Sequence, residues 1–332
     1  MDVITHLALG ICTTEVVLHK APDKKILFWG AVAQALPDID TIPALFLPAH
    51  QALLIHRGFT HSLVFAIGCG FILALIVKKG FKTPAIPLLS LFLFFWFQLT
   101  LHDLLDVCNS YGTGLLEPFS HQRFSINLLY VADPVFTIGL IVAGLLLIFK
   151  SRLNLNRNKC AWTALTVSAL YLVFAGFNKN YIDNKVNTSL SNQKINPAGY
   201  FSTPAPFTCM LWYIVVAADS TYYTAYSSVW DDTNQPIIFE SHIKNYRLAD
   251  SVRDRSALQD LIIFTDHYYT ISQSGHSLYL NVLRFGQVQG WSAPDAPFVL
   301  SYPLTAGNGD AALLQKGRLA GWNVESLKTY IK

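Results

Sequence analysis

The sequence predicts a membrane-embedded all-α helical bundle of about six hydrophobic segments, followed by an α+β domain. Apolar residues make up 52% of the chain and charged residues only 14%, and the mean hydropathy is +0.36. This composition argues against an ordinary soluble protein. The long apolar runs all lie before about residue 178, whereas the rest of the chain has balanced charge and many aromatic residues. We therefore expect a helical membrane domain over residues 1–177 and a separate domain over residues 178–332.

The membrane domain is predicted from six apolar segments. Four are long enough, with their flanks, to cross a bilayer, and they cover residues 62–77, 84–101, 133–149 and 160–177. Two shorter segments, 4–18 and 26–36, leave three alternatives open: a short span, a re-entrant segment, or a helix buried against the others. The first residues carry no basic n-region and no small-residue cleavage site, so we expect the first segment to remain in the mature protein.

Basic residues predict which side of the membrane each loop occupies. Three clusters of basic residues lie between apolar segments. The first follows the first segment, the second lies between the third and fourth segments, and the third lies between the fifth and sixth. In that order they are Lys20, Lys24 and Lys25; Lys78, Lys79 and Lys82; and Lys150, Arg152, Arg157 and Lys159. The positive-inside rule assigns these clusters to the cytoplasm. Six crossings then place the loops at 37–61 and 102–132, and everything after about residue 178, outside the cytoplasm. The net charge of +3 is explained by these clusters, so no nucleic-acid partner is supported.

Residues 178–332 are predicted to form an extracytoplasmic α+β domain. Two hairpins are expected, 207–217 with 221–230 and 267–272 with 277–286. A helix is expected over 251–264, with Asp250 as its cap. The histidines of this region show no repeating ligand spacing with an acid, and we interpret them as ordinary fold residues: His242, His267 and His276.

The five cysteines support neither a zinc knuckle nor a disulfide framework, because no CxxC pair and no regular spacing occurs. Only Cys108 and Cys209 are predicted to face the oxidising side of the membrane. Two buried free thiols are the preferred interpretation, and a bridge between these two residues is the alternative.

Acid and histidine side chains gather at the predicted outer ends of the apolar segments: His6, Asp38, Asp40, His56, His61, His102 and Asp106. Ionisable groups at membrane depth are costly and mark function, and His with Asp is a ligand set for zinc or a similar metal. His102 and Asp106 are four residues apart, so both lie on one helix face. Asp38 and Asp40 would lie on one side of an extended chain. The alternatives are structural: helix-end hydrogen bonds for the first pair, a turn for the second, and a helix-start position for His61.

Other residues near these ends are candidates for positioning or chemistry. Arg57 either holds an anionic group of a substrate or pairs with Asp38 or Asp40. The sequence 109–114, with two glycines, predicts a turn that could also line the site. Asp133 followed by Pro134 predicts a helix N-cap and first helical residue.

Several short motifs in residues 1–177 resemble the YdjM-like family of bacterial inner-membrane proteins, which are described as metal-dependent hydrolases. The resemblance rests on the combination of these pieces: THLALG around His6, LPDID at 36–40, HRGFTHS at 56–62, HDLLD at 102–106, YGT at 111–113, Pro118-Phe119, Arg123 and Asp133-Pro134. It implies a multi-pass protein of the bacterial inner membrane. The region after residue 178 resembles no family that we can name.

The same family is distantly similar to bacterial zinc-dependent phospholipases C and single-strand-specific zinc nucleases. That similarity implies a set of metal ligands in this order along the chain: His6, Asp38 or Asp40, His61, His102 and Asp106. Asp106 would bridge two ions. Those enzymes add an HxxxE pair, which this sequence lacks, so we expect one or two divalent ions, with Zn²⁺ the expected metal, in place of three.

The predicted activity is metal-assisted hydrolysis, with a phosphoester as the expected bond. Arg57 would hold the anionic group, and Asp40 or Asp103 would accept a proton from water. A site at the membrane surface suits a lipid or lipid-linked substrate, and membrane lipids are the expected partners. Two alternatives come from other classes: a transporter that passes ions or protons through the same residues, and a scaffold in which the metal only stabilises the helices.

Overall fold

The computed structural model describes residues 1–18, 25–80, 86–149, 156–232, 235–293, 295–304, 314–315 and 330. The chain divides into two compact units. The helical unit comprises Met1–Ile42 and Ile55–Ala175, and the mixed unit comprises Pro43–Leu54 and Gly176–Lys332. Five of the basic residues used to predict topology lie outside the described residues: Lys20, Lys24, Lys82, Lys150 and Arg152.

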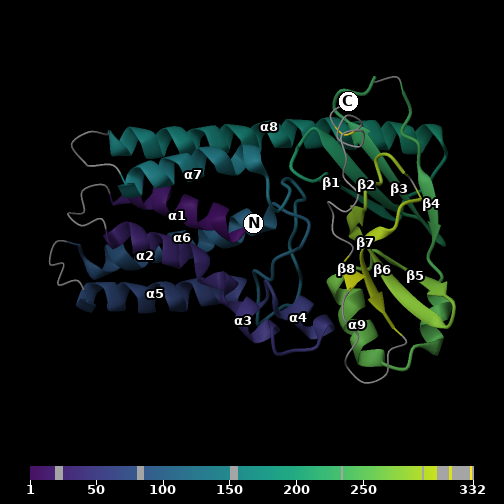
Figure 1. Cartoon of the computed structure of the whole chain (residues 1–332), viewed down its shortest axis with the longest axis horizontal. Helices are drawn as coiled ribbons and strands as arrows, with labels where there is room; N and C mark the ends of the chain where they lie inside the picture. Colours follow the sequence, from purple (N-terminus) through teal and green to yellow (C-terminus); the bar gives the residue numbers. More distant parts are fainter. Residues whose placement is uncertain are drawn as a thin grey trace. The chain divides into compact units, whose positions relative to one another are not determined.

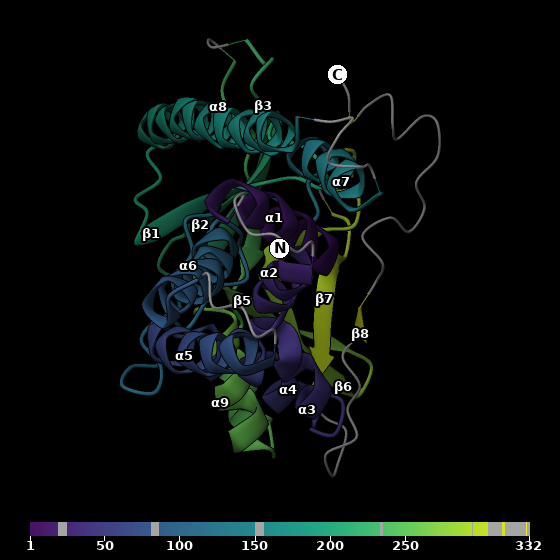
Figure 2. The same cartoon turned by 90° about the vertical axis from the view of Figure 1, so that its left-hand side faces the viewer.

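The helical unit is a bundle of helices that run side by side (Figure 1) and are seen end-on in Figure 2. Its members are α1 (Val3–Val17), α2 (Lys25–Ala35), α5 (Leu63–Gly80), α6 (Leu88–Val107), α7 (Pro134–Phe149) and the first part of α8 (Arg157–Asn192). Helix α1 packs against α2 and α7, and α5 packs against α6. Short elements connect α2 to α5: η1 (Pro37–Asp40), α3 (Thr41–Ala44), α4 (Ala49–Ile55) and η2 (Phe59–His61).

Among the described residues, three helices are long and apolar enough to cross a membrane, namely α5, α6 and α8. Helices α1 and α7 are apolar but shorter. Helix α2 has 11 residues, or about 16 Å at 1.5 Å per residue, against a hydrocarbon core of roughly 30 Å. The helical class is therefore observed, whereas six full spans are not confirmed.

Side-chain caps fix where several helices begin. The Asp2 carboxylate accepts a hydrogen bond from Thr5 N at the start of α1 (3.0 Å), and Ser62 Oγ accepts one from Phe65 N at the start of α5 (3.1 Å). Asp133 Oδ1 accepts from the backbone N–H groups of the first turn of α7 (3.0 and 3.2 Å). The predicted N-cap at Asp133 is thus confirmed. These caps satisfy backbone donors that the helix itself leaves open.

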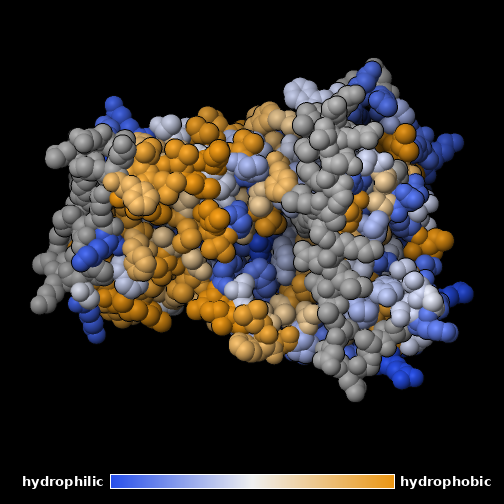
Figure 3. Space-filling model, in the orientation of Figure 1, coloured by the Kyte–Doolittle hydropathy of each residue, from blue (hydrophilic) through white to orange (hydrophobic). Residues whose placement is uncertain are grey.

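The interior and the outer surface of the bundle differ in kind. An apolar cluster of small and large side chains joins α2, α5 and α6, including Ala33, Ala74, Leu91 and Phe95. Large apolar side chains also point outward, and those that are more than half exposed include Ile72, Leu89, Ile138 and Leu170. Figure 3 shows that hydrophobic residues cover much of the visible side of the helical unit. Such a surface suits contact with lipid.

The mixed unit contains two antiparallel four-stranded sheets. One has the order β1 (Gly199–Pro204), β2 (Leu211–Ala217), β3 (Thr221–Ser228), β4 (Glu240–Ile243). The other has the order β5 (Tyr269–Ser274), β6 (Ser277–Gln287), β7 (Phe298–Pro303), β8 (Leu314–Gln315). Buried side chains from both sheets form one apolar cluster that includes Tyr213, Val215, Tyr222, Leu283 and Phe298. The expected α+β class and both expected hairpins are therefore observed.

Some local predictions need correction. The helix expected from residue 251 is α9 (Arg255–Phe264), and its cap is Asp254, whose side chain accepts from Ala257 N. Asp250 lies instead in the 3₁₀ helix η3 (Tyr246–Ser251), which ends before an extended residue at 252. Asp38 and Asp40 lie on the 3₁₀ helix η1, because Pro37 starts a tight turn there, and not on extended chain. All five cysteines are free. Cys209 is buried as expected, whereas Cys108 is only partly buried.

Candidate metal centre

Five predicted ligands from four separate elements meet at one end of the helical bundle. His6 comes from the first turns of α1, Asp38 from η1 and His61 from η2, while His102 and Asp106 come from the last turns of α6. The antiparallel course of the helices makes this possible, since α1 and α5 begin where α2 and α6 end (Figure 1). The three histidines and Asp106 are fully buried, and the Asp38 side chain is 11% exposed.

Four of these residues offer one ligand atom each within 4.8 Å of all the others: Asp38, His61, His102 and Asp106. The Nε2 atoms of His61 and His102 lie 3.1 Å apart. His61 Nε2 is 3.4 Å from Asp38 Oδ1 and 3.5 Å from Asp106 Oδ2. His102 Nε2 is 3.8 and 3.7 Å from the same two oxygens. Zinc bonds to such donors are about 2.0–2.2 Å, so the spacing suits four donors around a single ion.

His6 lies beside this four-residue group and is not a member of it. Its ring stacks on that of His102, with the ring centroids 3.7 Å apart. Its Nε2 atom is 3.2 Å from Asp106 Oδ1, an oxygen that the Met1 amino group also contacts. Asp106 therefore directs one oxygen to the four-donor group and the other to His6, which is the arrangement a bridging carboxylate would need.

The rings of His6 and His102 are oriented by one residue, Gln34. Its backbone carbonyl accepts from His102 Nδ1 (2.5 Å), and its side-chain Oε1 lies 3.3 Å from His6 Nδ1. Gln34 is held in turn by Gln98, to whose backbone carbonyl its amide nitrogen donates (2.8 Å). Because each Nδ1 carries the proton in these hydrogen bonds, each Nε2 presents a lone pair toward the acids. Gln34 was not among the predicted residues, and its only sequence signal is a glutamine inside an apolar segment.

Asp40 is a hydrogen-bond acceptor for three neighbours. It receives bonds from Arg57 N, from Thr60 Oγ1 and from His56 Nδ1, each at 2.9 Å. Burial would raise the pKa of Asp40, but its hydrogen bonds with His56 and His61 outweigh burial and hold that pKa far below its usual range. Asp40 also forms a second group of potential ligand atoms with Asp38 and His56. With its own Nδ1 at 3.4 Å from Asp40 Oδ2, His61 is oriented in the same way as the other two imidazoles.

The centre has an excess of negative charge. Burial lowers the pKa of His61, yet its contacts with the carboxylates of Asp106, Asp38 and Asp40 prevail and raise that pKa to about 10. Asp103 is 1% exposed, and neither of its carboxylate oxygens has a hydrogen-bond partner among the residues that the structure describes. It interacts electrostatically with His61, Asp106 and Asp38. Burying a carboxylate without a partner costs on the order of several kcal/mol. A positive charge close to Asp103 would offset that cost.

Arg57 brings a positive charge to the centre, where it pairs with Asp106. Its guanidinium pairs with Asp106 Oδ2 through Nε (3.0 Å), donates from Nη1 to Asn109 Oδ1 (2.6 Å), and lies over the Tyr111 ring at 4.9 Å. Neither Asp38 nor Asp40 is its side-chain partner, because the left-handed backbone at Arg57 (φ 61°) turns its N–H toward Asp40 and its side chain toward α6. Through these two contacts, Asn109 and Tyr111 of the sequence 109–114 lie against Arg57.

The donor chemistry and the charge both fit a divalent metal. Imidazole nitrogens and carboxylate oxygens are ligands for zinc and similar ions. Four acids lie in or beside the cluster, namely Asp38, Asp40, Asp103 and Asp106. The Arg57 guanidinium and the Met1 amino group both pair with one of them, Asp106. The fold and this centre define a helical membrane protein with a candidate metal site buried at one end of its bundle.

Comparison with known proteins gives the family. The profile of the YdjM inner membrane protein family matches residues 1–182, and the chain belongs to that family. It is an inner membrane protein. It is similar to the inner membrane protein YbcI of Escherichia coli (strain K12), with 36% identity over 124 residues, 37% of this chain and 70% of the relative.

The chain is also similar to the uncharacterized protein YfhP of Bacillus subtilis (strain 168). Identity is 30% over 152 residues, which are 43% of this chain and 45% of that protein. The match therefore spans less than half of the Bacillus relative. No solved structure matches the chain.

Proposed function

We propose that the chain is a membrane-bound, metal-dependent hydrolase that acts on a phosphoester or lipid-linked substrate at the outer face of the membrane. The observation that carries the proposal is the group of four donors, Asp38, His61, His102 and Asp106, of which all but the partly exposed Asp38 are buried. Beside it lies the buried Asp103, whose carboxylate has no hydrogen-bond partner among the described residues. A purely structural role would not need another buried acid, Asp103, whose carboxylate has no hydrogen bond within the described part of the chain.

The residues divide into holding, orienting and reacting groups. Asp38, His61, His102 and Asp106 would hold the ion, for which Zn²⁺ is our choice. A bound divalent ion lowers the pKa of water and stabilises negative charge on phosphoryl oxygens. Asp103 would accept the proton from that water, since its oxygens have no hydrogen-bond partner in the described ranges.

Asp40 is the weaker candidate for the proton acceptor. Its oxygens already accept three hydrogen bonds and contact His61, so it would act by orienting the imidazole. Arg57 uses Nε and Nη1 in its contacts with Asp106 and Asn109. Its Nη2 group would be the one that binds an anionic oxygen of the substrate.

The location supports the substrate class. The centre lies at the end of helices whose outer surfaces are apolar, so a substrate anchored in the bilayer could reach it without leaving the lipid. Faster hydrolysis of phospholipid vesicles than of a soluble phosphoester would support a substrate anchored in the bilayer.

The experiment compares four forms of the full chain: the native protein, Asp103→Asn, His102→Ala and His121→Ala. His121 is the matched control, because its side chain is 83% exposed and pairs only with Glu117 among its described contacts. Metal content, thermal midpoint and hydrolysis of bis-p-nitrophenyl phosphate and phospholipid vesicles are measured on each. Asp103→Asn should have the metal content and thermal unfolding midpoint of the native protein, and its hydrolytic activity should be about 10²–10⁴-fold lower. His102→Ala should lose metal, midpoint and activity together.

Other results would reject the proposal. Activity that falls only in proportion to folded protein would indicate a metal-stabilised scaffold. Metal binding with no hydrolysis of any phosphoester, together with ion flux in proteoliposomes that His102→Ala abolishes, would indicate a transporter. His121→Ala should match the native protein in every measurement.

A further inference from the structure

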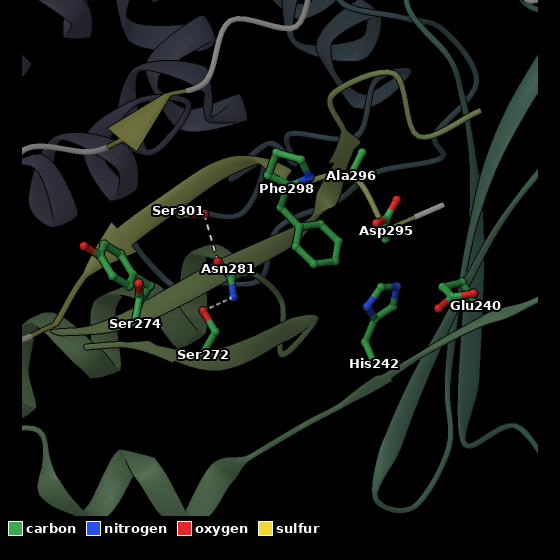
Figure 4. A pocket seen from close by; sticks show the side chains of 11 residues that line it. Glu240, His242, Ser272, Ser274, Asn281, Asp295, Ala296, Phe298 and Ser301 are labelled. Carbon is green, nitrogen blue, oxygen red and sulfur yellow. Dashed lines mark hydrogen bonds between the residues drawn. The ribbon is translucent and has the colours of Figure 1, made fainter. Parts of the chain in front are cut away.

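The mixed unit contains a cleft that is separate from the metal centre and that no part of the proposed hydrolysis uses. Its volume is about 590 Å³, within the range of small-molecule sites. Its walls come from β4 of one sheet and from β5, β6 and β7 of the other, as Figure 4 shows. Its lining includes Glu240, His242, Ser272, Asn281, Phe298 and Ser301.

One wall carries a row of hydrogen-bonding groups in a fixed pattern. Strand pairing places Thr270, Asn281 and Ser301 next to one another across β5, β6 and β7. Ser301 Oγ donates to Asn281 Oδ1 (2.8 Å), and Asn281 Nδ2 donates to Ser272 Oγ (2.9 Å), both drawn in Figure 4. The Ser272 hydrogen and the Ser301 lone pairs are therefore left for a ligand. The wall presents one hydroxyl donor and one hydroxyl acceptor, both preset by Asn281.

The opposite side is aromatic. His242 from β4 and Phe298 from β7 point toward each other, with ring centroids 5.2 Å apart and planes at 64°. His242 Nε2 is 2.8 Å from Thr224 Oγ1, which fixes the ring. Burial lowers the pKa of His242, so the ring is neutral at neutral pH. Pro297 also lines the cleft, which gives this side an apolar surface beside the polar row.

The charges of the lining select among ligand classes. Two carboxylates, Glu240 and Asp295, line the cleft, and its described lining includes no lysine or arginine. A phosphate, a nucleotide or an acidic peptide would meet uncompensated negative charge. The hydroxyl groups of a sugar ring can donate to the carboxylates and to Ser301, and they can accept from Ser272. The ring also has an apolar C–H face that can pack against an aromatic side chain.

We propose that this cleft binds a neutral saccharide of about one or two sugar rings. Ser272 and Ser301 form hydrogen bonds with the hydroxyl groups of the sugar, and the carboxylates accept further hydroxyl hydrogens. Phe298 and Pro297 pack against the face of the sugar ring. The cleft shares no residue with the metal centre, so saccharide binding can be tested whether or not the protein proves to be a hydrolase. A cationic amine is the competing ligand, because it too would be drawn to Glu240 and Asp295.

The test uses the full chain in lipid nanodiscs, since glycoside detergents carry a sugar that would compete. Saturation-transfer NMR measures binding of glucose, galactose and N-acetylglucosamine, with glucosamine and glucuronate as cationic and anionic sugars and spermidine as an amine without a ring. At least one neutral sugar should bind with a dissociation constant in the range of about 0.1–10 mM. Ser272→Ala should weaken it roughly three- to tenfold, as expected for one lost hydrogen bond.

Two further variants make the result specific. Ser241→Ala is the matched control, because residue 241 lies between Glu240 and His242 on β4 and points to the other face of the strand; it should bind as the native protein does. Glu240→Gln keeps an acceptor oxygen, so neutral-sugar binding should change by less than about threefold. The proposal is overturned if no neutral sugar binds at about 20 mM. It is also overturned if spermidine binds instead and Glu240→Gln abolishes that binding, or if Ser272→Ala behaves like Ser241→Ala.

Discussion

At the residue scale, Gln34 connects the metal centre to the interior of the bundle. It accepts from both His6 and His102, and its amide group is held by Gln98. Gln98 is fixed in turn by Thr13, whose hydroxyl donates to the Gln98 side-chain oxygen (2.9 Å). Each residue in this series of hydrogen bonds is fully buried or nearly so. The hydrogen bonds therefore set which nitrogen of each imidazole faces the acids before any ion binds.

Replacement of Gln34 by alanine should weaken metal binding without removing a ligand. Loss of an outer hydrogen-bond partner of a metal-binding histidine typically costs 10–100-fold in affinity, and we expect an effect of about that size. Competition with a chelator of known affinity measures it. The control is Gln122→Ala, because Gln122 is exposed. Equal affinity in Gln34→Ala and native protein would show that the Gln34 side chain does not orient His6 for an ion; the Gln34 backbone carbonyl that holds His102 is present in both proteins.

The candidate ligands could be predicted from the sequence because charged groups in apolar surroundings are rare and informative. His102 and Asp106 stand out at the end of an apolar run, and Arg57 is one of few basic residues near them. Gln34 and Ser272 could not be found in this way. A glutamine in a helix or a serine in a strand has no distinctive spacing, and its role depends on partners that the fold brings from far along the chain. The metal itself stays a prediction.

At the element scale, the contact between α1 and α2 depends on two glycines. A Cβ atom at Gly10 would lie 2.6 Å from the carbonyl oxygen of Gly30. A Cβ atom at Gly30 would lie 1.7 Å from Thr14 Oγ1. Small residues let membrane helices approach closely, and here the close approach also brings His6 on α1 and Gln34 on α2 into contact.

Gly30→Ala should therefore separate α1 from α2 and destabilise the protein. Overpacking of this kind typically costs about 1–3 kcal/mol, which would appear as a lower thermal midpoint in nanodiscs. Gly68→Ala is the matched control, since a Cβ atom there meets nothing within 4 Å. Metal affinity should fall in Gly30→Ala and stay unchanged in Gly68→Ala. A midpoint equal in both variants would contradict this account of the packing.

Elements with a strong apolar period or a turn signal were predicted well, and elements that depend on context were not. The hairpin of β5 and β6 follows from alternation around Gly275, whose φ is +60°. The predicted helix at 160–177 continues as α8 to Asn192, because hydropathy marks only its apolar half and not the polar turns after it. The short helices α3 and α4 have too few residues for a period to show. The domain boundary at residue 178 stays a prediction.

At the scale of the whole molecule, charge is distributed unevenly along the helical bundle. Basic residues among the described helix ends lie at the end away from the metal centre: Lys25, Lys78, Lys79, Arg157 and Lys159. Arg157 is also locked there by a buried, two-pronged pair with Glu15 (2.7 and 3.0 Å). Under the positive-inside rule this end faces the cytoplasm, so the metal centre would face the opposite side.

Helix α8 makes that orientation testable. It runs without a break from Arg157 to Asn192, so residue 188 lies about 46 Å along the helix from Arg157. The hydrocarbon core is roughly 30 Å thick, and a helix that starts at the cytoplasmic face must therefore leave the core before residue 188. Thr188 is exposed on α8 and Lys79 is exposed at the end of α5, so both positions can report the side that they occupy.

We expect Thr188→Cys, in a background without the five native cysteines, to react with a membrane-impermeant maleimide in intact spheroplasts. Lys79→Cys is the matched control and should react only after the membrane is permeabilised. The reason is the same for both: the lysine and arginine groups hold one end of the bundle in the cytoplasm, and α8 is long enough to carry residue 188 across. If Thr188→Cys needs permeabilisation while Lys79→Cys does not, the bundle is inverted. The metal centre would then face the cytoplasm, and a substrate at the outer face would be excluded.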